Sequence, residues 1–203
     1  MTTEQLHEWM KETYQLIQDN KEELSALDQE VGDGDHGTNM NRGFQAIVEE
    51  LPNWAGESLA TTLQKIGMTL ISKVGGASGP LLGTGFMRLS TSFKNEVNWG
   101  DGLESASEGI AKRGKAEVGE ATLLDVWSAV SKSVREHGLD WNRVADVSRD
   151  AMERTKELEA KRGRGALLGE RSIGHLDPGA VSSDYLFQAL ARVMKGADDE
   201  CRT

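Results

Sequence analysis

The sequence predicts an all-α fold, an eight-helix antiparallel up-and-down barrel or bundle. Apolar residues recur at the i, i+3, i+4, i+7 spacing of amphipathic helices, and no segment keeps the alternation typical of a strand. The connections between these segments are mostly short, which favours antiparallel neighbours. With 203 residues, 37% of them hydrophobic and a further 23 glycines, we expect one globular domain over 1–203.

The first four predicted helices have the clearest apolar stripes and cover 3–20, 37–51, 57–74 and 80–97. Ser78 is the predicted N-cap of the fourth, with Pro80 in its first turn. The stripes are Leu6, Trp9, Met10, Leu16 and Ile17; Met40, Phe44, Ile47, Val48 and Leu51; Leu59, Leu63, Ile66, Leu70 and Val74; and Leu82, Phe86, Leu89, Phe93 and Val97.

The last four helices are predicted at 102–112, 123–137, 141–160 and 180–195. Thr122, followed three residues later by Asp125, predicts a capping pair at the start of the second of these. The stripes are Leu103, Ala106 and Ile110; Leu123, Val126, Trp127, Val130 and Val134; Val144, Val147, Ala151, Thr155 and Leu158; and Tyr185, Leu186, Ala189, Leu190 and Val193.

The charge balance excludes some classes of partner. Lys and Arg number 23 against 33 Asp and Glu, so the formal net charge is −10. Nucleic acids and anionic membranes bind clustered basic residues, so we expect neither as a partner. The single cysteine, Cys201, excludes an intrachain disulfide, and the N-terminus lacks the pattern of a signal peptide. We therefore expect a cytoplasmic protein.

Glycines gather in four loops, each directly before an even-numbered predicted helix. In an up-and-down arrangement these helices all begin at the same end, so the loops converge there. Helix N-termini present unpaired N–H groups and a partial positive charge. The loops at 30–37, 73–80, 111–122 and 162–180 therefore predict an anion site on an acidic protein.

The densest constellation is LDQEVGDGDHGTNMNRG at 27–43, which places Asp28, Asp33 and Asp35 within eight positions. Carboxylates packed this closely need a cation, and oxygen ligands favour a hard ion such as Mg²⁺. The alternative is a solvated acidic turn. An EF-hand does not fit, because Phe44 stands where that loop needs its bidentate Glu.

The other loops add possible phosphate contacts. GGASGP at 75–80 matches neither a Rossmann nor a P-loop pattern and is alternatively a plain turn. The 162–180 loop offers Arg164 and Arg171 as cations, or is a polar surface loop. His36 either donates to a phosphate oxygen or orients Asp35. A cation site with phosphate-binding loops suffices for phosphoryl transfer, in which catalysis is mainly positioning and charge neutralisation.

Four motifs in order, LDQEVGDGDHGTNMNRGF, GGASGPLLGTGF, GEATLLDVW and ALLGERSIGHLDPGAVSSDYL, resemble the nucleotide-binding L subunits of dihydroxyacetone kinases, DhaL. The resemblance spans essentially the whole chain. It implies an eight-helix barrel with ADP or ATP and Mg²⁺ at one end. The GERSIGHLDPGA stretch is similar to members that are linked to the phosphoenolpyruvate phosphotransferase system.

The resemblance also implies roles for individual residues. It makes Asp28, Asp33 and Asp35 ligands of Mg²⁺, two ions in all. Leu123 would face adenine, and Arg164, with Arg171 as the weaker candidate, would approach phosphate or base. The implied nucleotide-binding residues are His36, Gly37, Thr38, Asn39, Ala77, Ser78, Gly79, Gly114, Thr122, Leu123, Arg164, Arg171, Asp177, Pro178 and Gly179. One departure is Gly119-Glu120-Ala121-Thr122-Leu123, where many relatives read G-D-K-T-M.

The function implied is transfer of a γ-phosphoryl group to dihydroxyacetone held by a separate K subunit, DhaK. No catalytic residue is expected on this chain. Resident ADP would be rephosphorylated by an M subunit, DhaM. The alternatives are an ATP-dependent subunit for a related ketose such as erythrulose, and a nucleotide-sensing bundle that transfers nothing.

Overall fold

The computed structural model describes residues 1–200, which are helical and contain no strand. Cys201 lies outside this range. The α-helices within it are α1 (Thr3–Asp19), α2 (Lys21–Val31), α3 (His36–Glu50), α4 (Leu59–Lys73), α5 (Ser78–Ser92), α6 (Trp99–Gly114), α7 (Leu123–His137), α8 (Trp141–Arg154) and α9 (Pro178–Glu200). Short 3₁₀ segments are η1 (Leu51–Trp54), η2 (Thr155–Glu157) and η3 (Gly165–Ser172).

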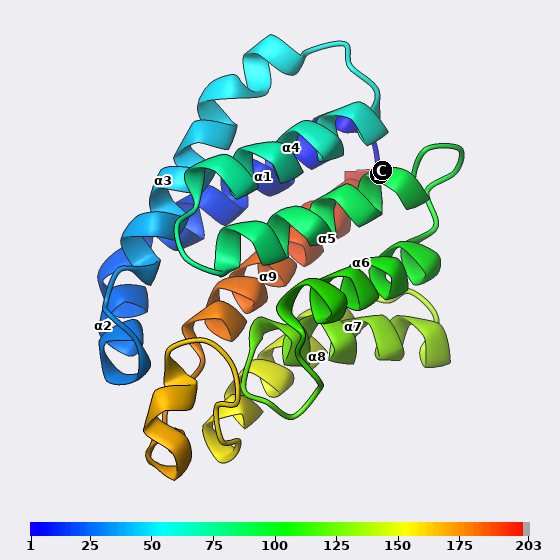
Figure 1. Cartoon of the computed structure of the whole chain (residues 1–203). Coiled ribbons are helices and arrows are strands. Elements are labelled where there is room, and N and C mark those ends of the chain that lie inside the picture. Colours follow the sequence, from blue (N-terminus) through cyan, green and yellow to red (C-terminus); the bar gives the residue numbers. More distant parts are fainter. Residues whose placement is uncertain (201–203) are drawn as a thin grey trace.

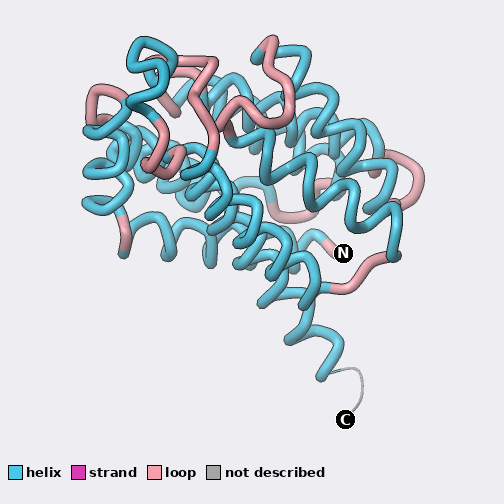
Figure 2. The backbone as a smooth tube through the Cα atoms, turned by 90° about the horizontal axis from the view of Figure 1, so that it is seen from below, coloured by secondary structure: helices cyan, strands magenta, loops and turns pink. Residues whose placement is uncertain are grey.

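Eight of these helices form a closed ring, as predicted. Its order is α1, α3, α4, α5, α6, α7, α8 and α9, and α9 packs back against α1 (Figure 1). Successive members run in opposite directions, with loops at both ends of the bundle (Figure 2). No helix in the described range is both long and apolar enough to cross a membrane.

Helix α2 is the element that the sequence prediction missed. It begins directly after Asn20, packs on α3 and α9, and buries only Leu24. Because one apolar anchor leaves almost no periodic stripe, the pattern of KEELSALDQEV does not stand out. α2 extends the first limb of the ring, so the directions of the later helices are unaffected.

Several predicted helix ends were wrong. The helix predicted at 80–97 ends at Ser92, and Asn98 accepts a hydrogen bond from the Asp101 backbone N–H, so α6 begins at Trp99 instead of 102. The helix predicted at 141–160 ends at Arg154, where η2 tightens the chain. Ser78 is the first residue of α5, which has no side-chain cap.

The ring encloses one apolar core built around aromatic rings. Trp9 lies 5.4 Å from Phe86 and 6.2 Å from Trp99, measured between ring centroids. Trp127, which is fully buried, packs edge-to-face on Phe187 at 5.0 Å. Tilted and edge-to-face arrangements are those that aromatic pairs prefer, so this core stabilises the relative positions of α1, α5, α7 and α9.

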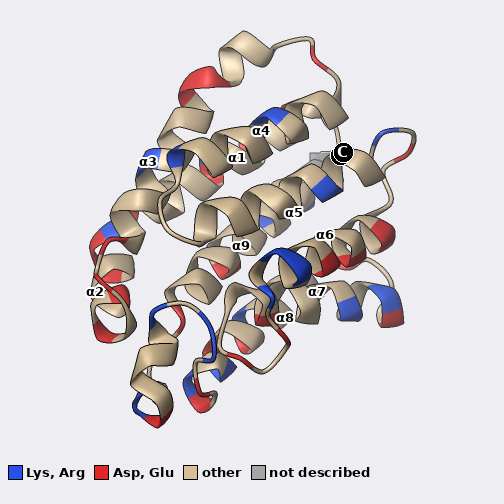
Figure 3. Cartoon of the chain, viewed as in Figure 1, with Lys and Arg blue, Asp and Glu red and all other residues tan. Residues whose placement is uncertain are grey.

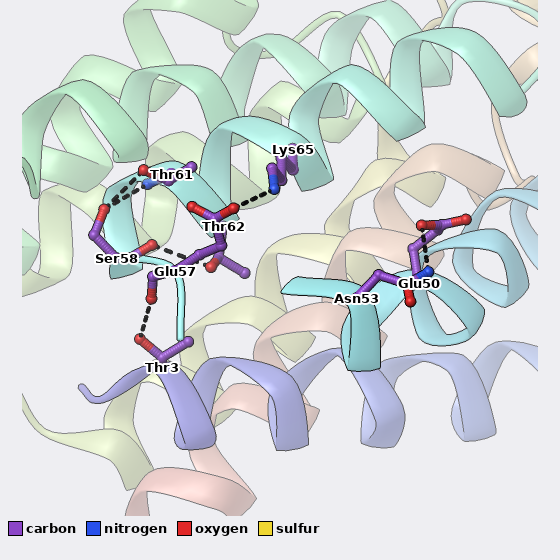
Figure 4. A network of polar contacts seen from close by, with 8 residues as sticks. All are labelled: Thr3, Glu50, Asn53, Glu57, Ser58, Thr61, Thr62 and Lys65. Atoms are coloured by element: carbon purple, nitrogen blue, oxygen red, sulfur yellow. Dashed lines mark hydrogen bonds and ion pairs between the residues drawn. The ribbon is translucent and has the colours of Figure 1, made fainter. Parts of the chain in front are cut away.

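The two ends of the ring differ in construction. At the end where α3 stops and α4 starts, side chains complete the turns: Ser58 caps α4 through the Thr61 N–H, and Lys65 pairs with Glu57 at 2.7 Å (Figure 4). Thr3 donates to the Glu57 carbonyl at 3.5 Å, which ties α1 to the same turn. The opposite end, where α3, α5, α7 and α9 begin, is formed by the glycine-rich loops.

Candidate functional site

The N-termini of α3, α5, α7 and α9 meet around one cavity. This confirms that the four glycine-rich loops converge. The cavity is lined by Asp28, Val31, Asp33, Asp35, His36, Asn39, Gly75, Gly76, Ala77, Ser78, Leu81, Ala121, Thr122, Leu123, Ala160, Arg162, Gly163, Arg164, Gly165, Ser172, His175, Leu176, Asp177, Pro178 and Gly179. Four helix N-termini directed at one space favour an anionic ligand.

Three carboxylates lie together on one side of this cavity. One oxygen from each of Asp28, Asp33 and Asp35 lies within 4.8 Å of the others. Asp28 projects from the last turns of α2, and its Oδ2 accepts the backbone N–H groups of Asp35 at 2.9 Å and His36 at 3.1 Å. The Asp28 carboxylate is thus fixed at the start of α3. Three oxygen donors at this spacing fit a hard divalent cation such as Mg²⁺.

The close approach of Asp28 to the turn requires Gly32. A Cβ on Gly32 would lie 2.2 Å from Asp28 Oδ1, so any larger residue would displace the carboxylate. Gly34, two residues further on, has φ +77°, which glycine adopts without a steric penalty. These two glycines therefore allow the chain to fold back from α2 into α3 with the three aspartates on one face.

A basic segment faces the carboxylates from the other side. Arg164 Nη2 lies 2.7 Å from Asp33 Oδ2, and both side chains keep solvent access. Figure 3 shows this segment, 161–164, as a blue stretch of chain after α8. His175 Nδ1 lies 3.8 Å from Glu30, which adds a polar contact between the 162–180 loop and α2 itself. Arg164 is therefore placed beside the acidic cluster, where a phosphate-binding cation is useful.

His36 is buried, with 8% of its surface exposed, and links three of the four N-termini. Its Nε2 lies 3.1 Å from Ser182 Oγ, and its Nδ1 lies 3.5 Å from Ser78 Oγ. The Ser182 hydroxyl donates to the Gly179 carbonyl, which leaves its oxygen to accept from Nε2–H. Burial lowers the pKa of His36, against smaller opposing effects of Asp28 and Asp35. The ring therefore holds the N-termini of α3, α5 and α9 together as a neutral imidazole.

The start of α5 comes close to α3 because a glycine stands at 75. A Cβ on Gly75 would lie 2.8 Å from the Asn39 side-chain amide. Asn39 accepts a hydrogen bond from Arg42 Nη2 at 2.8 Å, and Arg42 Nε donates to the Lys73 carbonyl at 2.8 Å. Arg42 thereby ties α3 to the end of α4 and fixes the loop that carries Ala77 and Ser78 at the cavity.

The start of α7 is held by the predicted capping pair. Asp125 accepts from the backbone N–H groups of Thr122 at 2.8 Å and Gly119 at 2.6 Å. Ala121, between them, has φ +52°, an uncommon conformation for alanine. The turn is therefore shaped by Asp125 and its backbone hydrogen bonds, with a small side chain facing the cavity.

A second, more apolar cavity adjoins the first along α7. Its lining residues are Ala77, Pro80, Leu81, Ile110, Arg113, Gly114, Ala116, Thr122, Leu123, Leu124, Arg162 and Gly163. The residues common to both cavities are Ala77, Leu81, Thr122, Leu123, Arg162 and Gly163. One side thus offers carboxylates and helix N-termini, and the other offers aliphatic side chains. A ligand with a polyanionic end and a flat apolar end matches this division.

Asp177 is the residue directly before α9 and lines the cavity from the end of the 162–180 loop. Its Oδ2 accepts the Ala180 N–H at 2.7 Å, and its own N–H donates to Thr155 Oγ1 at 3.1 Å. Burial raises its pKa from 3.8 to about 7, helped by the charges of Asp125 and Asp28, while the Ala180 and Gly179 N–H groups act in the opposite direction. Asp177 therefore titrates near neutral pH.

Some residues singled out from the sequence do not line the first cavity. Gly37 and Gly79 serve packing: a Cβ on Gly37 would lie 2.1 Å from the Lys21 carbonyl, and one on Gly79 would lie 2.4 Å from the Val74 carbonyl. Thr38 and Arg171 are exposed and line neither cavity, whereas Gly114 lines the second. Of the two arginines, Arg164 is the one at the carboxylates.

The sequence reasoning also missed residues that the structure brings to the site. Ser182 contacts His36 from within α9, and nothing in the sequence signals this contact, which spans 146 positions. Arg162 lines both cavities, and its position two residues before Arg164 in R-G-R-G was the available signal. Gly76, Leu81, Ala160 and Leu176 complete the walls.

Comparison with known proteins gives consistent results. The DAK2 domain family matches residues 30–192. The ADP-binding subunit DhaL of PEP-dependent dihydroxyacetone kinase 1 from Listeria innocua is 45% identical over 186 residues, 90% of this chain and 92% of that protein. The ADP-binding subunit DhaL of the Escherichia coli PEP-dependent dihydroxyacetone kinase is 38% identical over 203 residues, 94% of this chain and 97% of that protein.

A solved structure shares the fold. The dihydroxyacetone kinase of C. freundii in complex with AMP-PNP and Mg²⁺ superposes with a TM-score of 0.76 at 25% identity. The match covers 92% of this chain and 33% of the C. freundii chain, so this chain corresponds to about a third of that protein. The ring of helices, the family match and the full-length relatives agree: this chain belongs to the DAK2 domain family, among the DhaL subunits of dihydroxyacetone kinases.

Proposed function

We propose that this chain is the nucleotide-binding subunit of a dihydroxyacetone kinase and donates the γ-phosphoryl group of a Mg²⁺-bound nucleotide to dihydroxyacetone held by a separate K subunit. The observation that supports this most is the meeting of four helix N-termini and three carboxylates around one cavity. Full-length relatives are named as ADP-binding subunits of such kinases, which supports the same assignment.

The metal would be held by Asp28, Asp33 and Asp35, whose oxygens lie within 4.8 Å of one another. When bound, Mg²⁺ neutralises phosphate charge and orients the phosphate oxygens. We propose two ions, because four positive charges exceed the three carboxylate charges and leave a surplus for phosphate. Asp28 is already oriented by two backbone N–H groups, so it binds without rearranging α3.

The phosphates would lie against the helix N-termini. Backbone N–H groups at the starts of α3 and α5, around Asn39, Ala77 and Ser78, bind the anion, and Arg164 approaches it from the 162–180 loop. The base would occupy the apolar cavity beside Leu123 and Gly114. Asp177, Pro178 and Gly179 would close the site. Thr122 keeps the start of α7 in place through the capping pair.

In the proposed transfer, no residue of this chain forms a covalent bond to the phosphoryl group. The γ-phosphoryl group leaves the β-phosphate oxygen and forms a new bond to a hydroxyl oxygen of dihydroxyacetone, which loses its proton on the K subunit side. The part played by this chain is to position the phosphates and exclude water. A general base on the partner explains why no catalytic residue was expected here.

We propose further that resident ADP is rephosphorylated by a phosphotransferase M subunit fed from phosphoenolpyruvate. Relatives named as ADP-binding subunits of PEP-dependent kinases support a supply of phosphoryl groups from phosphoenolpyruvate. The test begins with nucleotide released by denaturing the purified protein. Slowly exchanging ADP supports the phosphotransferase route, whereas an empty site supports ATP as donor.

Turnover decides between the remaining functions. The chain is mixed with a dihydroxyacetone-binding K subunit, and either ATP or phosphoenolpyruvate with the phosphotransferase proteins is added. Formation of dihydroxyacetone phosphate supports the proposal, and erythrulose in place of dihydroxyacetone tests the alternative ketose. Nucleotide binding without turnover under either supply identifies a nucleotide-sensing bundle and refutes the kinase assignment.

A further inference from the structure

Two chain segments far apart in the sequence are joined across the rim of the cavities. Arg162 Nε donates to Glu120 Oε2 at 2.7 Å, and Arg162 Nη2 donates to Glu120 Oε1 at 3.1 Å. The Lys161 backbone N–H donates to the Glu120 carbonyl at 3.2 Å. The loop before α7 and the segment after η2 thus meet through a bidentate ion pair and one backbone hydrogen bond.

The Glu120 carboxylate has a second hydrogen-bond donor besides Arg162. Glu120 Oε2 also accepts the Glu117 N–H at 2.8 Å, and the Glu120 side chain is only 17% exposed. The Arg162 side chain is 42% exposed and reaches the carboxylate from outside. The pairing lowers the pKa of Glu120 and raises that of Arg162, so both are charged at neutral pH. Glu120 is therefore held in place by a contact that does not depend on Arg162, whereas the Arg162 side chain is the more exposed partner.

Few other contacts hold the basic segment in place. Residues 161–164 are all exposed, and a Cβ on Gly163, which has φ +62°, would meet nothing within 4 Å. The segment is tied on one side to Glu120 through Arg162 and on the other to Asp33 through Arg164. Since 161–164 reads Lys-Arg-Gly-Arg and has no apolar side chain to bury, these polar contacts determine whether the segment stays across the rim.

The arginine of the pair lies where the two cavities meet. Arg162 and Gly163 line both of them, as do Thr122 and Leu123, which follow Glu120 in the chain. A ligand that filled both cavities would therefore contact the 161–164 segment at the point where this segment is joined to Glu120.

We propose that Glu120 and Arg162 form a clamp that sets how long the nucleotide stays bound. This inference rests on the proposed nucleotide-binding function. Glu120 is a positioning residue: it acts on the nucleotide through Arg162 and the 161–164 segment. A closed clamp suits a resident nucleotide that is rephosphorylated in place, and a weakened one suits exchange with free nucleotide.

The direction in which Glu120→Gln changes the rate of nucleotide release distinguishes the clamp from simple electrostatics. Glu120 is a negative charge near a polyanion, so by charge alone Glu120→Gln removes repulsion and slows nucleotide release. The clamp requires the opposite result, because the glutamine loses the charge-assisted bidentate contact. Arg162→Gln, which removes an attractive charge, speeds release in both cases and is therefore informative only together with Glu120→Gln.

The experiment measures dissociation of a fluorescent ADP analogue, mant-ADP, from the full chain in excess Mg²⁺, after mixing with unlabelled ADP. We expect Glu120→Gln to raise the dissociation rate roughly 3- to 10-fold with little change in the association rate. The double variant Glu120→Gln/Arg162→Gln is expected to dissociate no faster than Arg162→Gln alone, because the pair acts as a unit. Glu159→Gln, which removes the partner of neighbouring Lys161, is the matched control and leaves the rate unchanged.

The outcomes separate the clamp from the function beneath it. Unchanged or slower release from Glu120→Gln, with binding intact, overturns the clamp and leaves the proposed function standing. Failure of the unmodified chain to bind mant-ADP overturns the proposed function and the clamp with it. Should Glu120→Gln fail to fold, Arg162→Lys keeps the charge but not the bidentate geometry, and it must speed release for the clamp to hold.

Discussion

The metal site is tested most directly by Asp33→Asn, which keeps the shape of the side chain and removes one carboxylate. Without ligand the substitution breaks only the Asp33–Arg164 ion pair, whose side chains are 35% and 66% exposed. Pairs this exposed contribute about 0–1 kcal/mol to the free energy of unfolding. We therefore expect the ligand-free variant to melt within about 3 °C of the unmodified protein.

The ligand-bound proteins should differ by more. Mg·ADP at 100 times its dissociation constant adds about 2.7 kcal/mol to stability. For a chain of this length that raises the melting temperature by roughly 5–10 °C. Loss even of groups behind a metal ligand costs about 10- to 100-fold in affinity, and loss of a ligand should reach at least the upper figure. At 100-fold weaker binding the same ligand concentration adds only about 0.4 kcal/mol, or about 1 °C.

The assay is thermal melting with and without Mg·ADP. Glu30→Gln is the control, because Glu30 lies three residues before Asp33, at the end of α2, and undergoes the same change of charge, yet its side chain is 61% exposed and lies outside both cavities. The control should keep the full ligand-induced shift. A full shift in Asp33→Asn, or an equal loss in Glu30→Gln, would refute the assignment of Asp33 to the metal.

Three further predictions concern stability. The pKa of Asp177 lies above its unfolded value, so the native state binds more protons between pH 4 and 7 and stability falls as pH rises through this window. In EDTA, urea titrations should show that the free energy of unfolding is lower at pH 8 than at pH 5, by up to about 2–3 kcal/mol from this group, and that this difference is absent in Asp177→Asn. An equal difference between the two pH values in both proteins would contradict the assignment. Gly79→Ala should destabilise by about 1–3 kcal/mol, because the new Cβ meets the Val74 carbonyl at 2.4 Å. Gly100→Ala, whose Cβ meets nothing closer than 3.4 Å, should be near neutral, and equal effects would remove the steric argument. Thr122→Ala should lower the free energy of unfolding, measured by chemical denaturation, by about 0.5–2 kcal/mol because the α7 cap is lost. Thr122→Ser keeps the capping hydroxyl and should retain most of this stability.

The ring was predictable because its signals are local. Leu63, Ile66 and Leu70 repeat at helical spacing and are all buried in α4. Thr122 and Asp125 form the capping box that their spacing indicates. The convergence of the glycine loops followed from alternating helix directions, and it survived the omission of α2 because α2 only extends the first limb.

The remaining features depend on contacts that have no local signature. The His36–Ser182 contact and the Glu120–Arg162 pair join residues 146 and 42 positions apart. Gly37 and Gly79 have the same sequence context as a glycine facing a ligand, yet they permit helix packing. Helix ends near 154 and 99 were displaced because capping and 3₁₀ turns override apolar periodicity there.

The alternating directions of the ring also affect how a ligand arrives. Macrodipoles of antiparallel neighbours cancel at distances beyond the helix spacing, so the favourable field of the four N-termini acts only within the cavity. At longer range an approaching polyphosphate meets a protein of net charge −10, which repels it. Moderate salt therefore speeds association by screening this repulsion, which is opposite to the behaviour of a nucleic-acid-binding protein. The contacts inside the cavity therefore provide the selectivity for the anion. Long-range electrostatic attraction does not help to bring the anion to the cavity.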